Sequence, residues 1–118
     1  EQISFPVGSL ISRAGQVPLD GVLITQGFAS VVVNGVTHRL GPGSVIGVAE
    51  GLAELPLLHT YHAETPVEAR VLPILDIEVA MEKSPPRLRG IFKLSLERIL
   101  GERFFQVRNG NLFMKNAN

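Results

Sequence analysis

The first two thirds of the chain consist of short apolar, β-prone runs that are separated by Gly, Pro, Asn and Asp. Runs of this kind, bounded by turn residues, are typical of strands. They predict strands at residues 3–5, 9–12, 22–26, 29–33, 36–40, 59–64 and 67–74. Asn34-Gly35 joins two of these runs and favours a type I′ hairpin, because that turn needs two residues with positive φ. Strands this short and evenly spaced indicate a barrel or jelly roll.

After Pro73 the pattern becomes helical. Residues 76–83 predict one short helix, and a second helix is expected to start with Ser84 as its N-cap and Pro85 at its first position. Apolar residues then recur at helical spacing on two sides, the first with Leu88, Phe92, Leu96, Ile99 and Leu100 and the second with Ile91, Leu94 and Phe105. Two interpretations stay open here: the helix packs only on the barrel, or it lies between the barrel and a partner.

Length and composition narrow the class of protein. A chain of 118 residues with 45% hydrophobic and 19% charged residues predicts one globular domain, which we place at residues 1–105, with residues 106–118 as a linker or tail. Eleven basic and eleven acidic residues balance, so no overall field attracts nucleic acid or an anionic membrane. The chain has no cysteine, which fits a reducing cytoplasm, and no apolar run long enough to span a bilayer. It begins with Glu1 instead of Met, and we expect it to be a piece of a longer protein.

Three short motifs resemble those of a known family. Phe5-Pro6-Val7-Gly8, followed by Ile11 and Gly15, is similar to the opening strand pair of cyclic-nucleotide-binding domains. Residues 24–31 match its I-x-x-G-x-x-x-V hairpin, and residues 40–47 are similar to the L-x-x-G-D-x-F-G run that leads into its phosphate-binding cassette.

The resemblance implies a fold and a site. The fold would be mainly β, a double-stranded β-helix (jelly-roll) barrel followed by C-terminal α-helices. The family includes the sensor half of regulators related to the catabolite activator protein, and modules in channels and kinases. Its cassette uses a Glu for the ribose hydroxyl and an Arg for the cyclic phosphate, whose buried charge needs a charge-assisted partner.

The cassette of this chain departs from that pattern. Val48 stands where the resemblance places the Glu, and Leu57 where it places the Arg; no Lys or Arg occurs between Arg39 and Arg70. We therefore expect no cofactor and no conventional binding of cAMP or cGMP. The degenerate cassette positions, where an uncharged ligand or the protein's own side chains would lie, are Gly47, Val48, Ala49, Glu50, Leu57, Leu58 and His59.

Other chemistry finds little support in the sequence. His59 and His62 are three residues apart and would point to opposite faces of a strand, so we expect no metal site. The serines lack a nucleophile-elbow context and the carboxylates form no recognisable acid–base pair, so we expect no enzyme. The region after Gly101 has no room for a helix-turn-helix, and DNA binding by this domain is not expected.

The sequence thus predicts a cytoplasmic regulatory or sensor module, or one on the cytosolic face of a membrane protein. It would act through its C-terminal helix on an attached effector domain or on a second copy in a homodimer. The residues expected to make that contact are Leu88, Ile91, Leu94 and Leu96. Two alternatives remain: a small-molecule receptor with an altered cassette, and a purely structural dimerisation domain.

Overall fold

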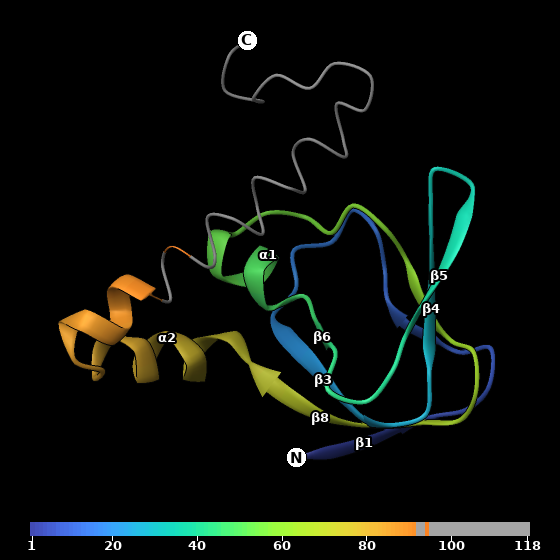
Figure 1. Ribbon diagram of the computed structural model, residues 1–118, viewed down its shortest axis with the longest axis horizontal. Coiled ribbons are helices and arrows are strands. Elements are labelled where there is room, and N and C mark those ends of the chain that lie inside the picture. Colours follow the sequence, from blue (N-terminus) through green and yellow to red (C-terminus); the bar gives the residue numbers. More distant parts are fainter. Residues whose placement is uncertain (92–93, 95–118) are drawn as a thin grey trace, which may run out of the picture. The chain divides into compact units, whose positions relative to one another are not determined.

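The computed structural model of the chain describes residues 1–91 and residue 94. The strands and helices follow one another along the chain as shown in Figure 1. They are β1 (Gln2–Phe5), β2 (Leu10–Ser12), β3 (Asp20–Gln26), β4 (Ala29–Val33), β5 (Val36–Leu40), β6 (Val45–Ile46), α1 (Val48–Ala53), β7 (Tyr61–Ala63), β8 (Val67–Pro73) and α2 (Ile74–Glu82). Residues 86–91 are also helical.

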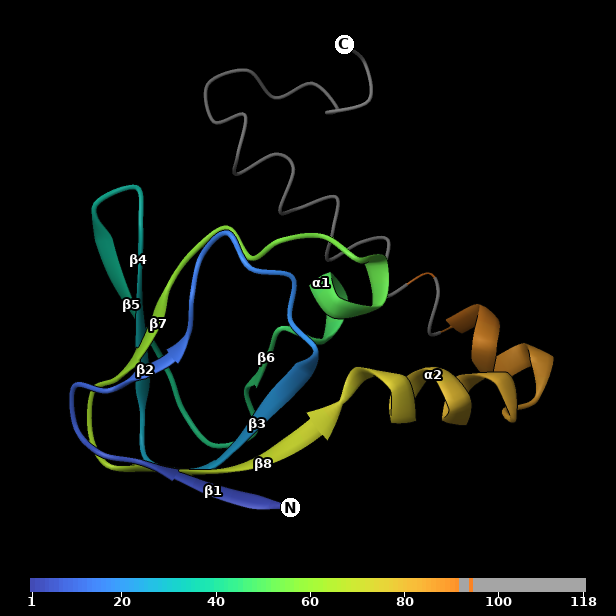
Figure 2. The ribbon, with the colours of Figure 1, turned by 180° about the vertical axis from the view of Figure 1, so that it is seen from behind.

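Two four-stranded antiparallel sheets make up the β part. One has the order β1-β8-β3-β6 and the other β2-β7-β4-β5. Figure 2 shows β2 and β7 lying across from β1, β8 and β3. The predicted fold class, mainly β with C-terminal helices and jelly-roll strands, is confirmed. The two sheets are, however, not closed into the barrel that the sequence predicted.

The core lies between the sheets and follows the two-residue period of the strands. In β3, Val22 and Ile24 are buried and pair with Val71 and Ala69 of β8, so the four side chains share one face. The buried cluster consists of Val22, Ile24, Ala29, Ile46, Ala63, Val67 and Ala69. Burial of this inner face fixes the strand register, because a slip of one residue would turn every apolar side chain toward water.

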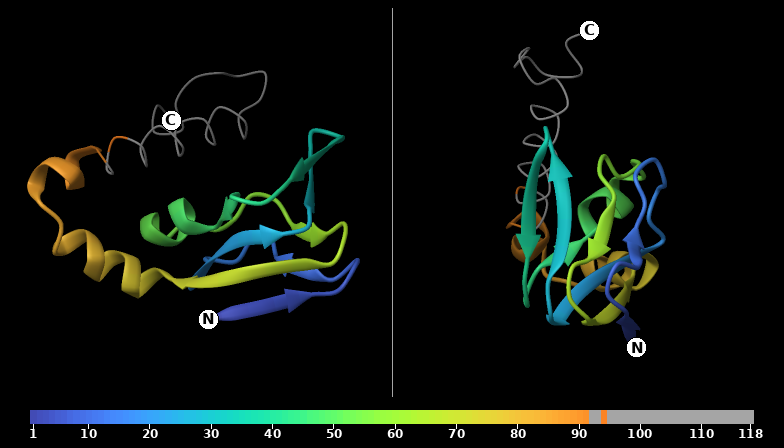
Figure 3. Two further views of the ribbon diagram at one scale, coloured as in Figure 1. Left: turned by 60° about the horizontal axis from the view of Figure 1, so that its bottom comes forward. Right: turned by 90° about the vertical axis from the view of Figure 1, so that its right-hand side faces the viewer.

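The β4–β5 hairpin forms as predicted. Asn34 and Gly35 have φ of 52° and 78°, and Val33 pairs with Val36 across this two-residue turn. Figure 3 shows the hairpin projecting beyond the neighbouring strands.

The second predicted helix begins one residue later than expected. The Ser84 hydroxyl donates to the carbonyl of Ala80, 2.9 Å away in α2, and so does not cap the next helix. The first hydrogen bond of that helix runs from the Arg89 N–H to the Pro85 carbonyl at 3.1 Å, which makes Pro85 its cap. The preceding helix, α2, starts at Ile74, two residues before the predicted Asp76.

The chain divides into two compact units, Glu1–Glu78 and Val79–Asn118. The first contains both sheets and α1. The predicted boundary between residues 105 and 106 lies outside the described residues, as do Phe92, Leu96, Ile99, Leu100 and Phe105 of the predicted helix.

Candidate functional site

The predicted cassette begins with a sharp turn at Gly47. Its φ of 89° is left-handed, and it is the N-cap of α1 without any side-chain cap. Its carbonyl accepts the N–H of Gly51 at 2.9 Å. Ala49 is buried and Val48 half-buried, so the first turn of this six-residue helix packs inward with apolar side chains.

Leu57 is held rigidly beside the segment that precedes β3. Its N–H donates to the Gln16 carbonyl at 3.0 Å, and its carbonyl accepts the Gly15 N–H at 2.8 Å. The side chain is 4% exposed. A buried aliphatic group therefore occupies the position where the sequence resemblance places a phosphate-binding Arg.

His59 and His62 differ in their surroundings. His62 is exposed, whereas His59 and the neighbouring Leu58 are half-buried. The Nε2 atom of His59 is buried and has no hydrogen-bond partner. Among the described residues, no three His, Cys, Asp or Glu side chains come close enough to hold a metal ion.

Glu50 and Tyr61 form an electrostatic pair that the sequence did not suggest. Burial raises the pKa of the Tyr61 hydroxyl above its ordinary value of 10.0, and the nearby Glu50 carboxylate raises it further. Tyr61 shares the inner face of β7 with buried Ala63, two residues away, and this alternation is the signal that could have identified it.

A hollow of about 630 Å³ lies between the two sheets, beside the core. Leu57 reaches it, but the other predicted cassette positions do not. The first sheet contributes the inward residues Ile3, Phe5, Asp20, Val22 and Val71. The remaining lining residues are Ile11, Ser12, Arg13, Gln16, Val17, Pro18, Leu19 and Leu57.

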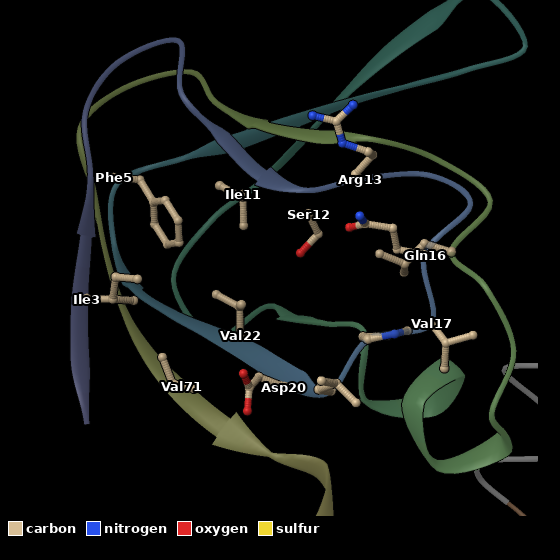
Figure 4. A pocket seen from close by; sticks show the side chains of 13 residues that line it. Ile3, Phe5, Ile11, Ser12, Arg13, Gln16, Val17, Asp20, Val22 and Val71 are labelled. Atoms are coloured by element: carbon tan, nitrogen blue, oxygen red, sulfur yellow. The ribbon is translucent and has the colours of Figure 1, made fainter.

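The polar groups of the hollow come from residues 12–20, from the end of β2 to the start of β3, which sequence reasoning did not single out. Figure 4 shows the Ser12 hydroxyl and the Asp20 carboxylate directed toward the hollow and the Gln16 amide above it. The guanidinium group of Arg13 turns away from it. Because Asp20 precedes Val22 and Ile24 by two and four residues, strand alternation could have placed it on the inner face.

Three of the four residues predicted for partner contact are described. Leu88, Ile91 and Leu94 are 54%, 58% and 68% exposed. All three lie in helical backbone. Leu96 lies outside the described residues.

No helix within the described part of the chain combines the length and apolar character needed to cross a membrane.

Neither a model of a known protein family nor a curated protein sequence matches the chain. Solved structures match it by fold. PKAR CBD2 with bound Sp-2Cl-cAMPS is 16% identical over 100% of this chain and 76% of its own, with a TM-score of 0.72. The cAMP-bound form of PfPKA-R is 18% identical over 88% of this chain and 33% of its own, with a TM-score of 0.62.

A further match is the cGMP-bound form of the EAL enzyme Bd1971. It is 12% identical over 90% of this chain and 33% of its own, with a TM-score of 0.72. This chain therefore spans about a third of that enzyme and of PfPKA-R. The chain has the fold of cyclic-nucleotide-binding domains, as the sequence resemblance predicted.

Proposed function

We propose that the chain is a non-catalytic regulatory module of the cytoplasm that acts through its C-terminal helix and does not bind cAMP or cGMP through a charge-assisted phosphate contact. The observation that carries the proposal is the burial of Leu57, which stands where the sequence resemblance places the phosphate partner. No Lys or Arg between Arg39 and Arg70 can replace it locally.

The energetic argument concerns the phosphodiester charge. Leaving a buried charge without its hydrogen-bond partner costs about 1–3 kcal/mol or more, which corresponds to roughly one to two decades of affinity. Glu50 adds a negative charge on α1, close enough to Tyr61 to influence it, and this charge opposes an anionic ligand.

Calorimetric titration with cAMP and cGMP tests the first half of the proposal. We expect no saturable binding of either nucleotide below about 100 μM, and a dissociation constant of a few micromolar would overturn the proposal. Leu57→Arg should strengthen cAMP binding, since it restores a guanidinium at this position. Leu58→Arg is the matched control, because it adds the same charge at the adjacent residue and should have a smaller effect.

The second half rests on exposed apolar groups. Leu88, Ile91 and Leu94 are helical residues whose aliphatic side chains are exposed to solvent. Several exposed apolar side chains close together in the sequence favour an interaction site. We propose a second copy of this chain as the partner.

Sedimentation over a range of protein concentrations tests this pairing. We expect a monomer–dimer equilibrium that shifts to monomer in the double variant Leu88→Ser, Ile91→Ser. The control is Arg87→Ser, Arg89→Ser on the same helix, which removes two exposed charged residues and should leave the dimer intact. A wild-type chain that stays monomeric at the highest concentration would refute dimerisation and leave an attached effector domain as the target.

A further inference from the structure

We propose that the hollow between the sheets binds a small amphiphilic cation, an ammonium group on an apolar body, with the ammonium group at Asp20. This inference goes beyond the proposed function, because it assigns a ligand class with the opposite charge to a cyclic nucleotide. It also assigns a different set of polar residues, which lie within residues 12–20.

The first step is the orientation of Asp20. It is the first residue of β3 and shares the inner face of that strand with Val22 and Ile24. Asp20 is exposed to solvent, and its backbone pairs with Pro73 of β8. Within residues 1–91 and 94, the Asp20 carboxylate has no hydrogen bond and no ion pair. A carboxylate at the mouth of an apolar hollow therefore keeps its full capacity to accept hydrogen bonds.

The second step is the sign of the charge around the hollow. Arg13 contributes to the lining, yet its guanidinium group turns away from the hollow in Figure 4. On β8, Arg70 alternates with the inward residues Ala69 and Val71 and is exposed on the opposite face of the sheet. Asp20 is therefore the charged group that faces the hollow from the described residues that line it. Such a site attracts a cation and repels an anion.

The third step is the apolar wall. Phe5, Ile11, Val22, Leu57 and Val71 line the hollow and can bury the hydrocarbon part of a ligand. The volume of about 630 Å³ lies within the range of small-molecule sites.

The fourth step is the supply of further acceptors. The Ser12 hydroxyl points into the hollow and the Gln16 amide lies above it. An ammonium group has three donors, so Asp20 and one or two of these oxygens can satisfy them together. A hydrogen bond between two ionised groups is stronger than one between neutral groups, which favours the ammonium over an alcohol of the same shape.

The test compares three probes of matched shape: 2-phenylethylammonium, 2-phenylethanol and phenylacetate. Binding is followed at neutral pH by chemical-shift perturbation of the backbone amides of the full chain. We expect the ammonium to bind about two- to fivefold more tightly than the alcohol, and the carboxylate most weakly, because Asp20 is exposed and solvent weakens its ion pair. The perturbed amides should belong to residues that line the hollow.

Asp20→Asn should abolish the preference for the ammonium and leave the alcohol's affinity nearly unchanged. Asp76→Asn, which neutralises an exposed carboxylate on α2 away from the hollow, is the matched control and should behave as wild type. Ser12→Leu narrows the hollow and should weaken all three probes. The amide spectrum of each variant reports whether it is folded.

Equal affinity for ammonium and alcohol in the wild type, or a preference that survives in Asp20→Asn, would overturn the proposal. Failure of all three probes to bind the folded wild type at millimolar concentrations would overturn it as well. The outcome is independent of the titrations with cAMP and cGMP, so failure of this inference and failure of the proposed function can be told apart.

Discussion

The buried hydroxyl of Tyr61 makes the stability of the protein depend on pH. This hydroxyl is neutral in the folded protein, and burial together with the Glu50 carboxylate disfavours the tyrosinate. A folded-state pKa above the unfolded value means that the unfolded chain releases this proton first as the pH rises. The contribution of Tyr61 to stability is therefore complete below about pH 10 and is lost as the pH rises through the folded-state pKa.

Alkaline titration of the wild type should show a tyrosinate transition above pH 10. The chain has one tyrosine and no tryptophan, so ultraviolet absorbance reports this hydroxyl alone. Glu50→Gln should lower the transition while leaving it above 10, because burial is the larger cause. Glu54→Gln, also in this region and exposed, is the control. A wild-type transition at the ordinary tyrosine pKa would contradict the assignment.

Single residues were predictable where their chemistry depends on sequence neighbours. The lack of a cation near Leu57 is visible in the sequence, and the structure adds that this side chain is buried. The position of Asp20 beside a hollow was not predicted, because residues of β1, β2 and β8, which are distant from one another in the sequence, line the same hollow. His59 was predicted as a cassette position, but the burial of its Nε2 atom was not predicted, because burial of one atom is a property of the assembled sheets.

At the scale of elements, the turn between β3 and β4 leaves the least space for a side chain, because its Gly27 lies against the backbone of Pro66. Gly27 has φ of 87°, and a Cβ at this position would collide with the Pro66 carbonyl oxygen. Gly8 has a similar φ of 82° but no atom within 4 Å of its Cβ position. Both glycines have the left-handed backbone conformation that strains other residues, and they differ in the space around the Cβ position.

Comparing Gly27→Ala with Gly8→Ala therefore separates the cost of a left-handed alanine from the cost of a steric collision. Gly8→Ala should reduce the free energy of unfolding by about 1–2 kcal/mol, the cost of a left-handed alanine. Gly27→Ala should reduce the free energy of unfolding by several kcal/mol, because its Cβ would also collide with the carbonyl of Pro66, just before β8. Urea denaturation followed by circular dichroism measures both. Equal losses would show that the segment at Pro66 moves aside without cost.

Elements defined by local chemistry were predictable, as the Asn34-Gly35 hairpin illustrates. The start of the second helix was not predictable, because the Ser84 hydroxyl can either cap the helix that follows or bond to the Ala80 carbonyl of the helix that precedes it, and it does the latter. The strand predicted at residues 59–64 is shorter, Tyr61–Ala63, since the chain before it pairs with the segment around Gly15.

At the scale of the whole molecule, the described hydrophobic core is complete within the first compact unit. Every buried hydrophobic residue among those described lies between Val22 and Ile74. The unit Glu1–Glu78 thus has the core that independent folding requires.

A chain that ends after Ser84 should therefore fold. This end point keeps α2 and the hydrogen bond from Ser84 to Ala80. We expect its free energy of unfolding to lie within about 1 kcal/mol of the full chain in urea denaturation, because no described core residue is removed. A loss of several kcal/mol would favour the interpretation in which the C-terminal helix packs on the sheets, which the sequence left open.

Among the described strands, the order of the second sheet gives β5 a neighbour on one side only. A free strand of this kind exposes a row of N–H and C=O groups to which another chain can add, the usual route to aggregation. Arg39 lies on that strand, bound to Glu64 at 2.6 Å and stacked 4.4 Å above the Phe28 ring. A strand added to β5 would lie beside the Arg39 guanidinium group, which its contacts with Glu64 and Phe28 hold in place. We therefore expect Arg39, which belongs to neither the cassette nor the hollow, to oppose aggregation along this edge.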